Sequence, residues 1–279
     1  MSRTILITGA TGNQGGATLH NLLGKGFALR ALTRKPDSDK AKSLASIGVE
    51  VVAGDLNDAD SLRRALAGVW GVFAVQNTWE AGVTAEEEQG TRIAELAHEA
   101  GVQHFVYSSV GSAHRETGIP HFDNKSRVER TIRGLGFPST VIIRPVFFME
   151  NLLSPWFMNG DTLVSALKPD TTLQMIAVED IGVFGAMAFT HAATLNGREI
   201  DIAGDAKTLP EAAAIIGRAL GKPLAFLQIS ISEVRKNSED FALMLEWFDR
   251  VGYDADITGI EREFGVKMTS LEAWARKQA

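Results

Sequence analysis

The chain has 279 residues, of which 45% are hydrophobic and 22% charged, and its net charge is −6. This length allows a substantial core in one large domain or in one and a half. The negative charge argues against a broad nucleic-acid surface, and the absence of cysteine excludes disulfides, thiolate nucleophiles and cysteine-ligated zinc. Because no leader segment precedes the first strand and no apolar run reaches about 18 residues, we expect a cytoplasmic protein that binds neither nucleic acid nor membrane.

A glycine-rich turn between a strand and a helix is the first functional signal. An apolar strand over residues 4–8 leads into Gly9-Ala10-Thr11-Gly12-Asn13-Gln14-Gly15, and a helix over residues 14–25 follows. The spacing is one residue longer than the common G-x-G-x-x-G pattern. The strand-turn-helix context nevertheless favours a dinucleotide pyrophosphate at the helix N-terminus over a plain loop. The expected cofactor contacts here are Gly9, Thr11, Gly12, Asn13, Gln14 and Gly15.

Two basic residues follow the second expected strand, over residues 28–33. An acidic residue at this place would bond the ribose 2′-hydroxyl of NAD, whereas this chain has Thr33-Arg34-Lys35-Pro36. Arg34 could grip a 2′-phosphate in fork geometry while Lys35 adds a point charge. The alternative is a solvated basic turn before a helix. We predict NADP(H) rather than NAD(H).

Strands and helices then alternate, which predicts an α/β fold with a Rossmann-type doubly wound parallel sheet. We expect strands over residues 49–53, 69–75, 104–108 and 140–144, and helices over 58–66, 85–99 and 121–135. After residue 145 we expect helices over 178–191, 210–220 and 239–251, with short strands over 198–202 and 225–229. This divides the chain into a Rossmann domain over 1–150 and a smaller mixed α/β C-terminal lobe over 151–279, interleaved with the first. A substrate would bind at the carboxyl ends of the strands.

Polar residues at strand ends are further candidates. Asp55 could bond the adenine amino group, or it could cap a helix, a role that Asn57 or Asp58 also suits. Gln76 and Asn77 could line the nicotinamide half of the cofactor, or belong to an ordinary loop. An apolar cluster past the sixth strand could wall a pocket for a flat substrate or could be core; its members are Phe147, Phe148, Met149, Trp156, Phe157 and Met158.

Together these motifs resemble the short-chain dehydrogenase/reductase superfamily, and within it the atypical NmrA-like family. The resemblance weakens after about residue 190. It rests on the glycine turn, Thr33-Arg34, Gly54-Asp55-Leu56, His121-Phe122-Asp123-Asn124-Lys125, Arg144-Pro145 and Glu150-Asn151-Leu152-Leu153. It implies that Leu56 and Pro145 also contact the cofactor.

The resemblance also implies a catalytic constellation, of which one member is missing here. Catalytic members of the superfamily place a serine after the fifth strand, and a tyrosine four residues before a lysine that holds the nicotinamide ribose. Ser108 and Lys125 match the serine and the lysine, but His121 stands at the place of the tyrosine. The chain has two tyrosines, and Tyr107 should point away from Ser108 on its strand, while Tyr253 lies far along the chain. His121 could act as a proton donor, or it could cap the helix or pack beside the cofactor.

Two functions follow from this comparison. The first is an NADPH-dependent reductase of a quinone-like or conjugated acceptor, with water or His121 supplying any proton. The second is a non-catalytic NADP(H) redox sensor that acts through a regulatory protein partner. The family's quinone and triphenylmethane-dye reductases are similar in the first respect, while the stretch around His121 is closer to its human redox sensor. We favour the reductase, with a flat aromatic or quinone-like substrate. The oligomeric state stays open, and the scattered histidines and carboxylates predict no metal site.

Overall fold

The computed structural model describes residues 3–279. The chain separates into two compact units, each drawn from three segments. Unit 1 contains the chain up to Ser109, then Asn124–Arg144 and Ile181–Ile200, and unit 2 contains Val110–Asp123, Pro145–Asp180 and Asp201–Ala279. We describe each unit by itself. Within the described residues, no helix combines the length and the apolar composition needed to cross a membrane.

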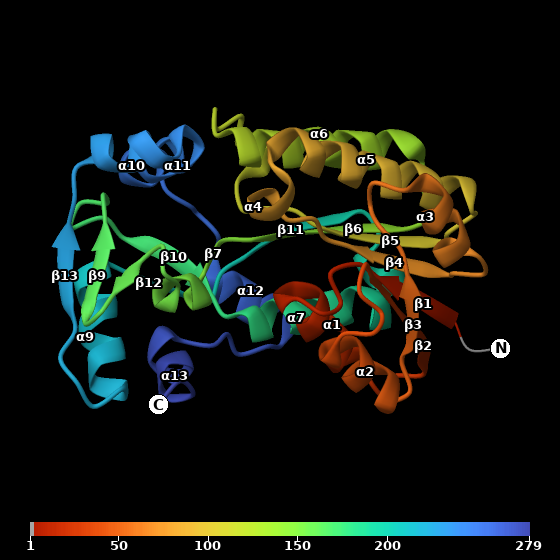
Figure 1. Cartoon of the computed structure of the whole chain (residues 1–279), viewed down its shortest axis with the longest axis horizontal. Coiled ribbons are helices and arrows are strands. Elements are labelled where there is room, and N and C mark those ends of the chain that lie inside the picture. Colours follow the sequence, from red (N-terminus) through yellow and green to blue (C-terminus); the bar gives the residue numbers. More distant parts are fainter. Residues whose placement is uncertain (1–2) are drawn as a thin grey trace. The chain divides into compact units, whose positions relative to one another are not determined.

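Unit 1 is built on a seven-stranded sheet with the order β11-β6-β5-β4-β1-β2-β3 (Figure 1). The pairs formed among β1 to β6 are parallel. This confirms the predicted doubly wound parallel sheet, whose order reverses between β1 and β4. The central strand β1 is buried on both faces, and Ile5, Leu6 and Ile7 have no exposed surface. The strands are β1 (Arg3–Ile7), β2 (Phe27–Thr33), β3 (Glu50–Ala53), β4 (Gly71–Ala74), β5 (His104–Ser108), β6 (Thr140–Pro145) and β11 (Arg198–Ile202).

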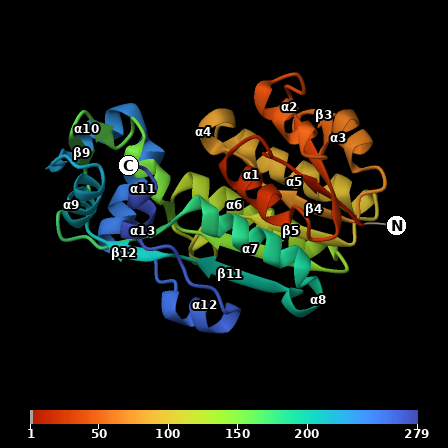
Figure 2. The ribbon, with the colours of Figure 1, turned by 90° about the horizontal axis from the view of Figure 1, so that it is seen from below.

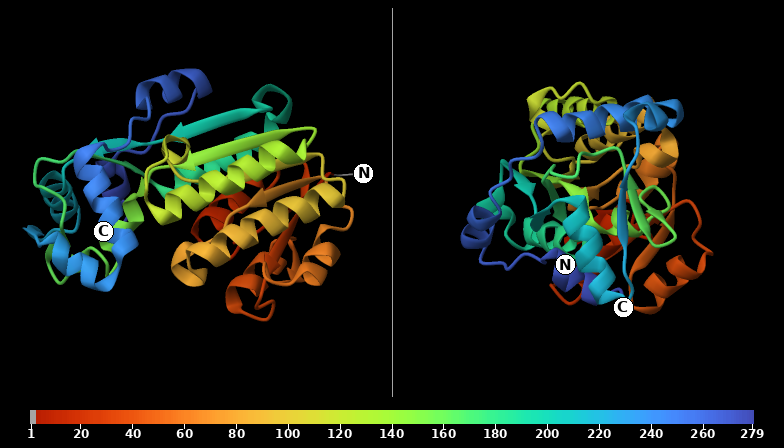
Figure 3. Two further views of the ribbon diagram at one scale, coloured as in Figure 1. Left: turned by 90° about the horizontal axis from the view of Figure 1, so that it is seen from above. Right: turned by 90° about the vertical axis from the view of Figure 1, so that its left-hand side faces the viewer.

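Helices cover both faces of this sheet. One face carries α1 (Asn13–Leu22), α2 (Asp39–Ser46) and α7 (Val178–Thr190), and the other carries α3 (Ala59–Leu66), α5 (Val83–Glu99) and α6 (Pro120–Leu135). In Figure 2, α1 and α7 lie side by side. The two helices approach so closely that a Cβ at Gly182 or Gly185 of α7 would collide with Ala17 or Thr18 of α1. In Figure 3, α5 and α6 likewise run next to each other. The shorter helices are α4 (Thr78–Ala81) and α8 (Ala192–Leu195).

Unit 2 contains two small sheets of three strands, with the orders β12-β10-β7 and β13-β9-β8. Helix α9 begins with a capping box, in which Glu211 accepts from the backbone N–H of Thr208 and the Thr208 hydroxyl accepts from Glu211 N. The strands are β7 (Phe147–Phe148), β8 (Met158–Asn159), β9 (Thr162–Ser165), β10 (Leu173–Ile176), β12 (Asp205–Lys207) and β13 (Ala225–Gln228). The helices are η1 (Ala113–Arg115), η2 (Met149–Leu153), α9 (Leu209–Ala219), α10 (Ile231–Asn237), α11 (Glu239–Arg250), α12 (Ile257–Phe264) and α13 (Leu271–Arg276).

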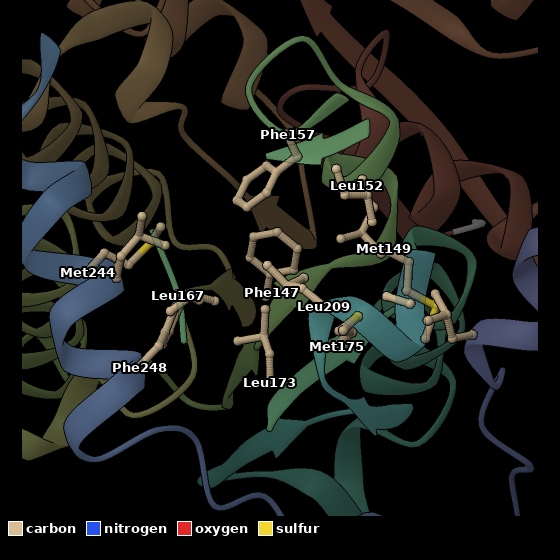
Figure 4. Packing of buried hydrophobic residues seen from close by; sticks show 14 of the residues in the cluster. Phe147, Met149, Leu152, Phe157, Leu167, Leu173, Met175, Leu209, Met244 and Phe248 are labelled. Carbon is tan, nitrogen blue, oxygen red and sulfur yellow. The ribbon is translucent and has the colours of Figure 1, made fainter. Parts of the chain in front are cut away.

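Much of the apolar cluster that follows β6 is buried in the core of unit 2. Figure 4 shows Phe147, Met149 and Phe157 inside this core, and all three are buried. The rings of Phe147 and Phe157 meet edge to face at 5.1 Å between centroids. Trp156, in contrast, is 61% exposed. For these three buried residues, packing in the core is therefore the role that the structure supports.

Candidate functional site

The start of helix α1 presents an anion-binding geometry in unit 1. Gly9 has a φ of 60°, and its carbonyl accepts from Gly12 N at 2.9 Å, which closes the turn. Gly12 is the N-cap, so no side chain caps the helix, and the first turn holds no acidic residue. A Cβ at Gly15 would collide with backbone atoms of Thr8 and Gly9. The first N–H groups and the positive helix end are therefore available to a phosphate.

Thr8 fixes this turn to the neighbouring strand end. Its hydroxyl donates to Val75 O at 2.9 Å and accepts from Val75 N at 2.8 Å. The Thr8 backbone N–H donates to Phe73 O at 3.0 Å. The loops after β1 and β4 therefore keep a set position relative to each other.

Three basic residues lie between the end of β2 and the first turn of α2, namely Arg34, Lys35 and Lys40. Arg34 is half exposed and pairs with Glu80 of α4, and that hydrogen bond raises the pKa of Arg34. The backbone N–H of Lys35 donates to Thr33 Oγ1 at 3.1 Å. Lys40, in the first turn of α2, reaches Thr11 O at 3.3 Å. Sequence reasoning missed Lys40, which lies six residues after Arg34 along the chain.

The segment after β3 shows that the helix cap is Asp58 and not Asp55. Asp58 caps α3 by accepting from Asp60 N and Ser61 N at 3.0 and 3.3 Å. Asp55 Oδ1 instead accepts from Asn57 N at 2.9 Å, a local turn that leaves its other oxygen available. The carbonyl of Leu56 accepts from Arg92 at 2.8 Å.

The segment after β4 holds two side-chain amides, of which one caps a helix and the other has no hydrogen-bond partner among the described residues. Asn77 Oδ1 caps the short α4 by accepting from Trp79 N at 3.1 Å. Gln76 is only 6% exposed, and neither atom of its amide has a hydrogen-bond partner among residues 3–279. Buried amides are normally paired with protein, water or ligand. The Gln76 amide thus has a donor and an acceptor to offer to a cofactor.

Lys125 lies in a buried polar cluster in unit 1. Its Nζ donates to Glu86 Oε1 at 2.7 Å, and Glu86 Oε2 accepts from Asn124 Nδ2 at 2.9 Å and from the Thr78 hydroxyl. Burial raises the pKa of Glu86, but the Lys125 charge and the hydrogen bonds from Lys125, Thr78 and Asn124 outweigh it and hold that pKa below its usual range.

Glu86 was not foreseen from the sequence, although a signal was present. It lies on the buried stripe of α5 that continues through Gly90, Ile93 and Ala97. A carboxylate on such a stripe requires a buried partner.

Ser108 and Lys125 contact different helices. Ser108 Oγ donates to Gln14 Oε1 of α1 at 2.5 Å. The preceding Tyr107 packs in the core under α3, α5 and α6, where its ring centroid lies 6.0 Å from Lys125 Nζ. The hydrogen-bond partners of Ser108 and Lys125 therefore belong to helices on opposite faces of the sheet, α1 and α5.

His121 is held within unit 2 by Asp240, from the first turn of α11. The ring Nδ1 lies 2.5 Å from Asp240 Oδ2, and the backbone N–H of His121 donates to Asp240 Oδ1 at 3.0 Å. This carboxylate therefore accepts from the backbone of the first turn of α6 and also lies against the imidazole ring, whose orientation it sets. Pro145, the last residue of β6, uses its carbonyl to accept from Gly111 N at 2.9 Å.

Neither tyrosine takes the place of the missing acid. Tyr107 is 1% exposed, its hydroxyl has no hydrogen-bond partner among the described residues, and burial raises its pKa well above 10. Burial does the same for Tyr253, whose ring stacks on Phe122. Across residues 3–279, no group of three or more His, Asp or Glu side chains is arranged to hold a metal ion.

Comparisons with known proteins agree with this fold and these motifs. The model of the NmrA-like family matches residues 1–277. An NmrA-like family domain-containing protein of Dictyostelium discoideum is 26% identical, over 99% of this chain and 98% of that protein. A (4-alkanoyl-5-oxo-2,5-dihydrofuran-3-yl)methyl phosphate reductase of Streptomyces griseus is 32% identical over 83% of this chain and 79% of its own length. An NmrA-like oxidoreductase of Aspergillus hancockii is 39% identical, but the match spans 54% of this chain and 48% of that protein.

Solved structures extend the likeness in fold. Triphenylmethane reductase of a Citrobacter species superposes with a TM-score of 0.83 at 23% identity, covering 99% of both chains. An NADPH-dependent quinone oxidoreductase of Escherichia coli gives a TM-score of 0.81 at 23% identity, covering 98% and 99%. NmrA, a negative transcriptional regulator solved in complex with NADP, gives 0.81 at 21% identity, covering 99% and 95%.

Proposed function

This chain belongs to the NmrA-like family, and from that premise we propose that it binds NADP(H) and reduces a quinone-like or conjugated acceptor. The observation that carries the proposal is the uncapped start of α1, together with three cations between the end of β2 and the first turn of α2, of which Lys40 reaches the glycine turn. An anion at the helix start and a second anion at Arg34, Lys35 and Lys40 match a pyrophosphate and a 2′-phosphate. The relatives named oxidoreductases and reductases support turnover.

The residues present suit the cofactor at each of its parts. Gly12 and the N–H groups of the first turn of α1 would hold the pyrophosphate, because Gly15 allows the helix to approach the turn. The free oxygen of Asp55 would accept from the adenine amino group, and the orphaned amide of Gln76 would pair with a polar group of the nicotinamide half. Lys125 would donate to ribose hydroxyls. When bound, the reduced cofactor supplies a hydride.

Proton delivery is where this chain departs from the tyrosine-dependent enzymes. Tyr107 is buried and Tyr253 is partly buried, and desolvation raises the pKa of both strongly, so neither is a useful acid at neutral pH. We propose water, or His121 beside Asp240, as the source of any proton. An acceptor such as a quinone or a conjugated cation suits this site because it needs little or no acid assistance.

The same lack of a tyrosine acid supports a second candidate, binding of NADP(H) without turnover as a signal to a protein partner. One experiment separates the two. NADPH oxidation is followed at 340 nm with a panel of quinones and triphenylmethane dyes, beside calorimetric titration of NADPH and NADP. Consumption of NADPH with any acceptor supports the reductase. Tight binding with no consumption across the panel would replace it with the sensor.

A further inference from the structure

We propose that Glu86 is the positioning residue of Lys125. Its buried carboxylate holds the ammonium so that the remaining N–H donors of Lys125 are available to the ribose hydroxyls of a bound dinucleotide. The inference rests on the proposed binding of NADP(H), and it gives a function to the one carboxylate buried on α5.

The first support is the incomplete bonding of Lys125. An ammonium has three N–H donors, and the described residues supply one acceptor, Glu86 Oε1 at 2.7 Å. The Tyr107 ring, 6.0 Å from Nζ, offers a weak additional contact. The Lys125 side chain is only 11% exposed, so bulk water does not fully solvate the other two donors. A ligand rich in hydroxyl oxygens would satisfy them.

The second support is that the Glu86 carboxylate is fixed in place. Its Oε2 accepts from the Thr78 hydroxyl of α4 and from Asn124 Nδ2 of α6, and Asn124 Nδ2 also donates to Val83 O at 2.8 Å. Partners on two helices, α4 and α6, therefore hold a carboxylate that α5 carries. Lys125 has a flexible four-carbon stem, and a fixed partner gives its ammonium one position. Asn124 Oδ1 is also buried and unpartnered within residues 3–279, so an acceptor is left open beside the pair.

The third support is that another ion pair already joins α5 and α6. Arg127 of α6 binds Glu87 of α5 through two hydrogen bonds of 2.8 and 2.7 Å. This pair joins the same two helices at the surface. A buried ion pair is itself weak evidence for stability, because desolvation offsets its attraction. The Glu86–Lys125 pair is thus better explained by ligand binding than by helix packing.

A double-mutant cycle tests the proposal on binding rather than on turnover. NADPH and NADH are titrated calorimetrically into the wild type, Glu86→Gln, Lys125→Met and the double variant. Glu86→Gln keeps an oxygen for the Thr78 donor and removes the charge. We expect it to weaken both dinucleotides by about 10- to 100-fold, the range for hydrogen bonds to charged groups. In the Lys125→Met background it should have no further effect. Glu87→Gln, the matched control, should leave both affinities unchanged.

A milder variant keeps the proposal testable if Glu86→Gln does not fold. Thr78→Val removes one hydrogen bond to the carboxylate and leaves the ion pair, so it should weaken both dinucleotides by about three- to tenfold, and only when Lys125 is present. Circular dichroism and melting temperatures verify folding. Two results would overturn the role of Glu86 and leave the proposed function intact. The first is an equal loss of dinucleotide affinity with and without Lys125, and the second is unchanged affinity in Glu86→Gln while Lys125→Met binds weakly. A wild type that binds neither dinucleotide would overturn the proposed function and this inference together.

Discussion

Acid should destabilise unit 1 through one buried histidine, His104 of β5. Its Nε2 lies 2.9 Å from Ala188 O, and its Nδ1 lies 2.8 Å from Ser139 Oγ. The ring is stacked on Trp70 and meets Phe189 edge to face, and His104 has no exposed surface. Because the carbonyl of Ala188 can only accept, Nε2 carries the proton and Nδ1 accepts from the serine hydroxyl. Protonation of Nδ1 would put a charge among aromatic rings.

The size of the effect follows from the pKa. Burial lowers the pKa of His104 from 6.5 to about 4, against the raising effect of the Ala188 hydrogen bond. Above pH 6.5 both folded and unfolded chains hold this ring neutral, so the fold is not penalised. As the pH falls from 6.5 to 4, the ring binds a proton in the unfolded chain but stays neutral in the folded chain, so the free energy of unfolding decreases. The loss is about 2 kcal/mol at pH 5 and approaches about 3.4 kcal/mol below pH 4.

The measurement compares the wild type with His104→Gln, which keeps polar atoms near both partners and cannot titrate. Urea unfolding at pH 7.5, 6.5, 5.5 and 5.0 gives the free energy of unfolding of each protein. The variant is less stable at pH 7.5, since it loses ring packing, but the gap should narrow by about 2 kcal/mol at pH 5. His98→Gln, at an exposed ring, is the control and should keep the wild-type pH dependence. A constant gap between the wild type and His104→Gln across this range would refute the reasoning.

Three further outcomes test other parts of the structure. Arg34→Ala should weaken NADPH by at least about tenfold and NADH by less than about threefold in calorimetric titration, and equal losses would remove Arg34 from the 2′-phosphate. Gly15→Ala should lower the free energy of unfolding by about 1–3 kcal/mol through backbone collision, whereas Gly134→Ala, at an open helical position, should raise it by about 0.5–1 kcal/mol in the same denaturation assay. Arg144→Met should cost about 3–5 kcal/mol, because the fully buried Glu129 loses both bonds from Arg144 and keeps only Arg133 as a charged partner among the described residues; a change below about 1 kcal/mol in urea unfolding would contradict that role of Arg144.

The fold of unit 1 was predictable because its signals are local. The apolar runs that form β1, β5 and β6 are buried on both faces, and each is bounded by turn residues or a helix cap. The glycine turn was predicted from spacing and context, and the structure gives Gly9 the positive φ that such a turn requires. The helix α6 was placed to within one residue at its start.

The elements of unit 2 were harder to predict because they are short and pair across long stretches of sequence. Strand β7 has two residues, too few to show a period, and it pairs with β10, in which Met175 lies opposite Phe147. The strand expected over residues 225–229 is confirmed as β13, but its partner β9, some sixty residues earlier, was not predicted. Helix α13 did carry a local signal, since Ser270 accepts from Ala273 N as a cap, and it was overlooked.

The candidate site shows the same division. Residues in motifs could be proposed from the sequence, whereas Glu86 and Asp240 could not, because each reaches its partner from a separate helix. Lys40 contacts the glycine turn across 29 residues of sequence. Sequence patterns report what a segment does with its own neighbours, and these contacts depend on how segments meet in space.

The buried pair of Glu86 and Lys125 also bears on how this protein can be engineered. A consensus or stability-driven redesign would exchange both residues for apolar ones of similar volume, since such exchanges of buried ion pairs are often neutral or favourable by about 1–4 kcal/mol. The product would melt later and would lack the ammonium that we assign to the ribose. Thermostabilised versions should therefore be screened for nucleotide retention, with positions 86 and 125 held constant, before any gain in melting temperature is accepted.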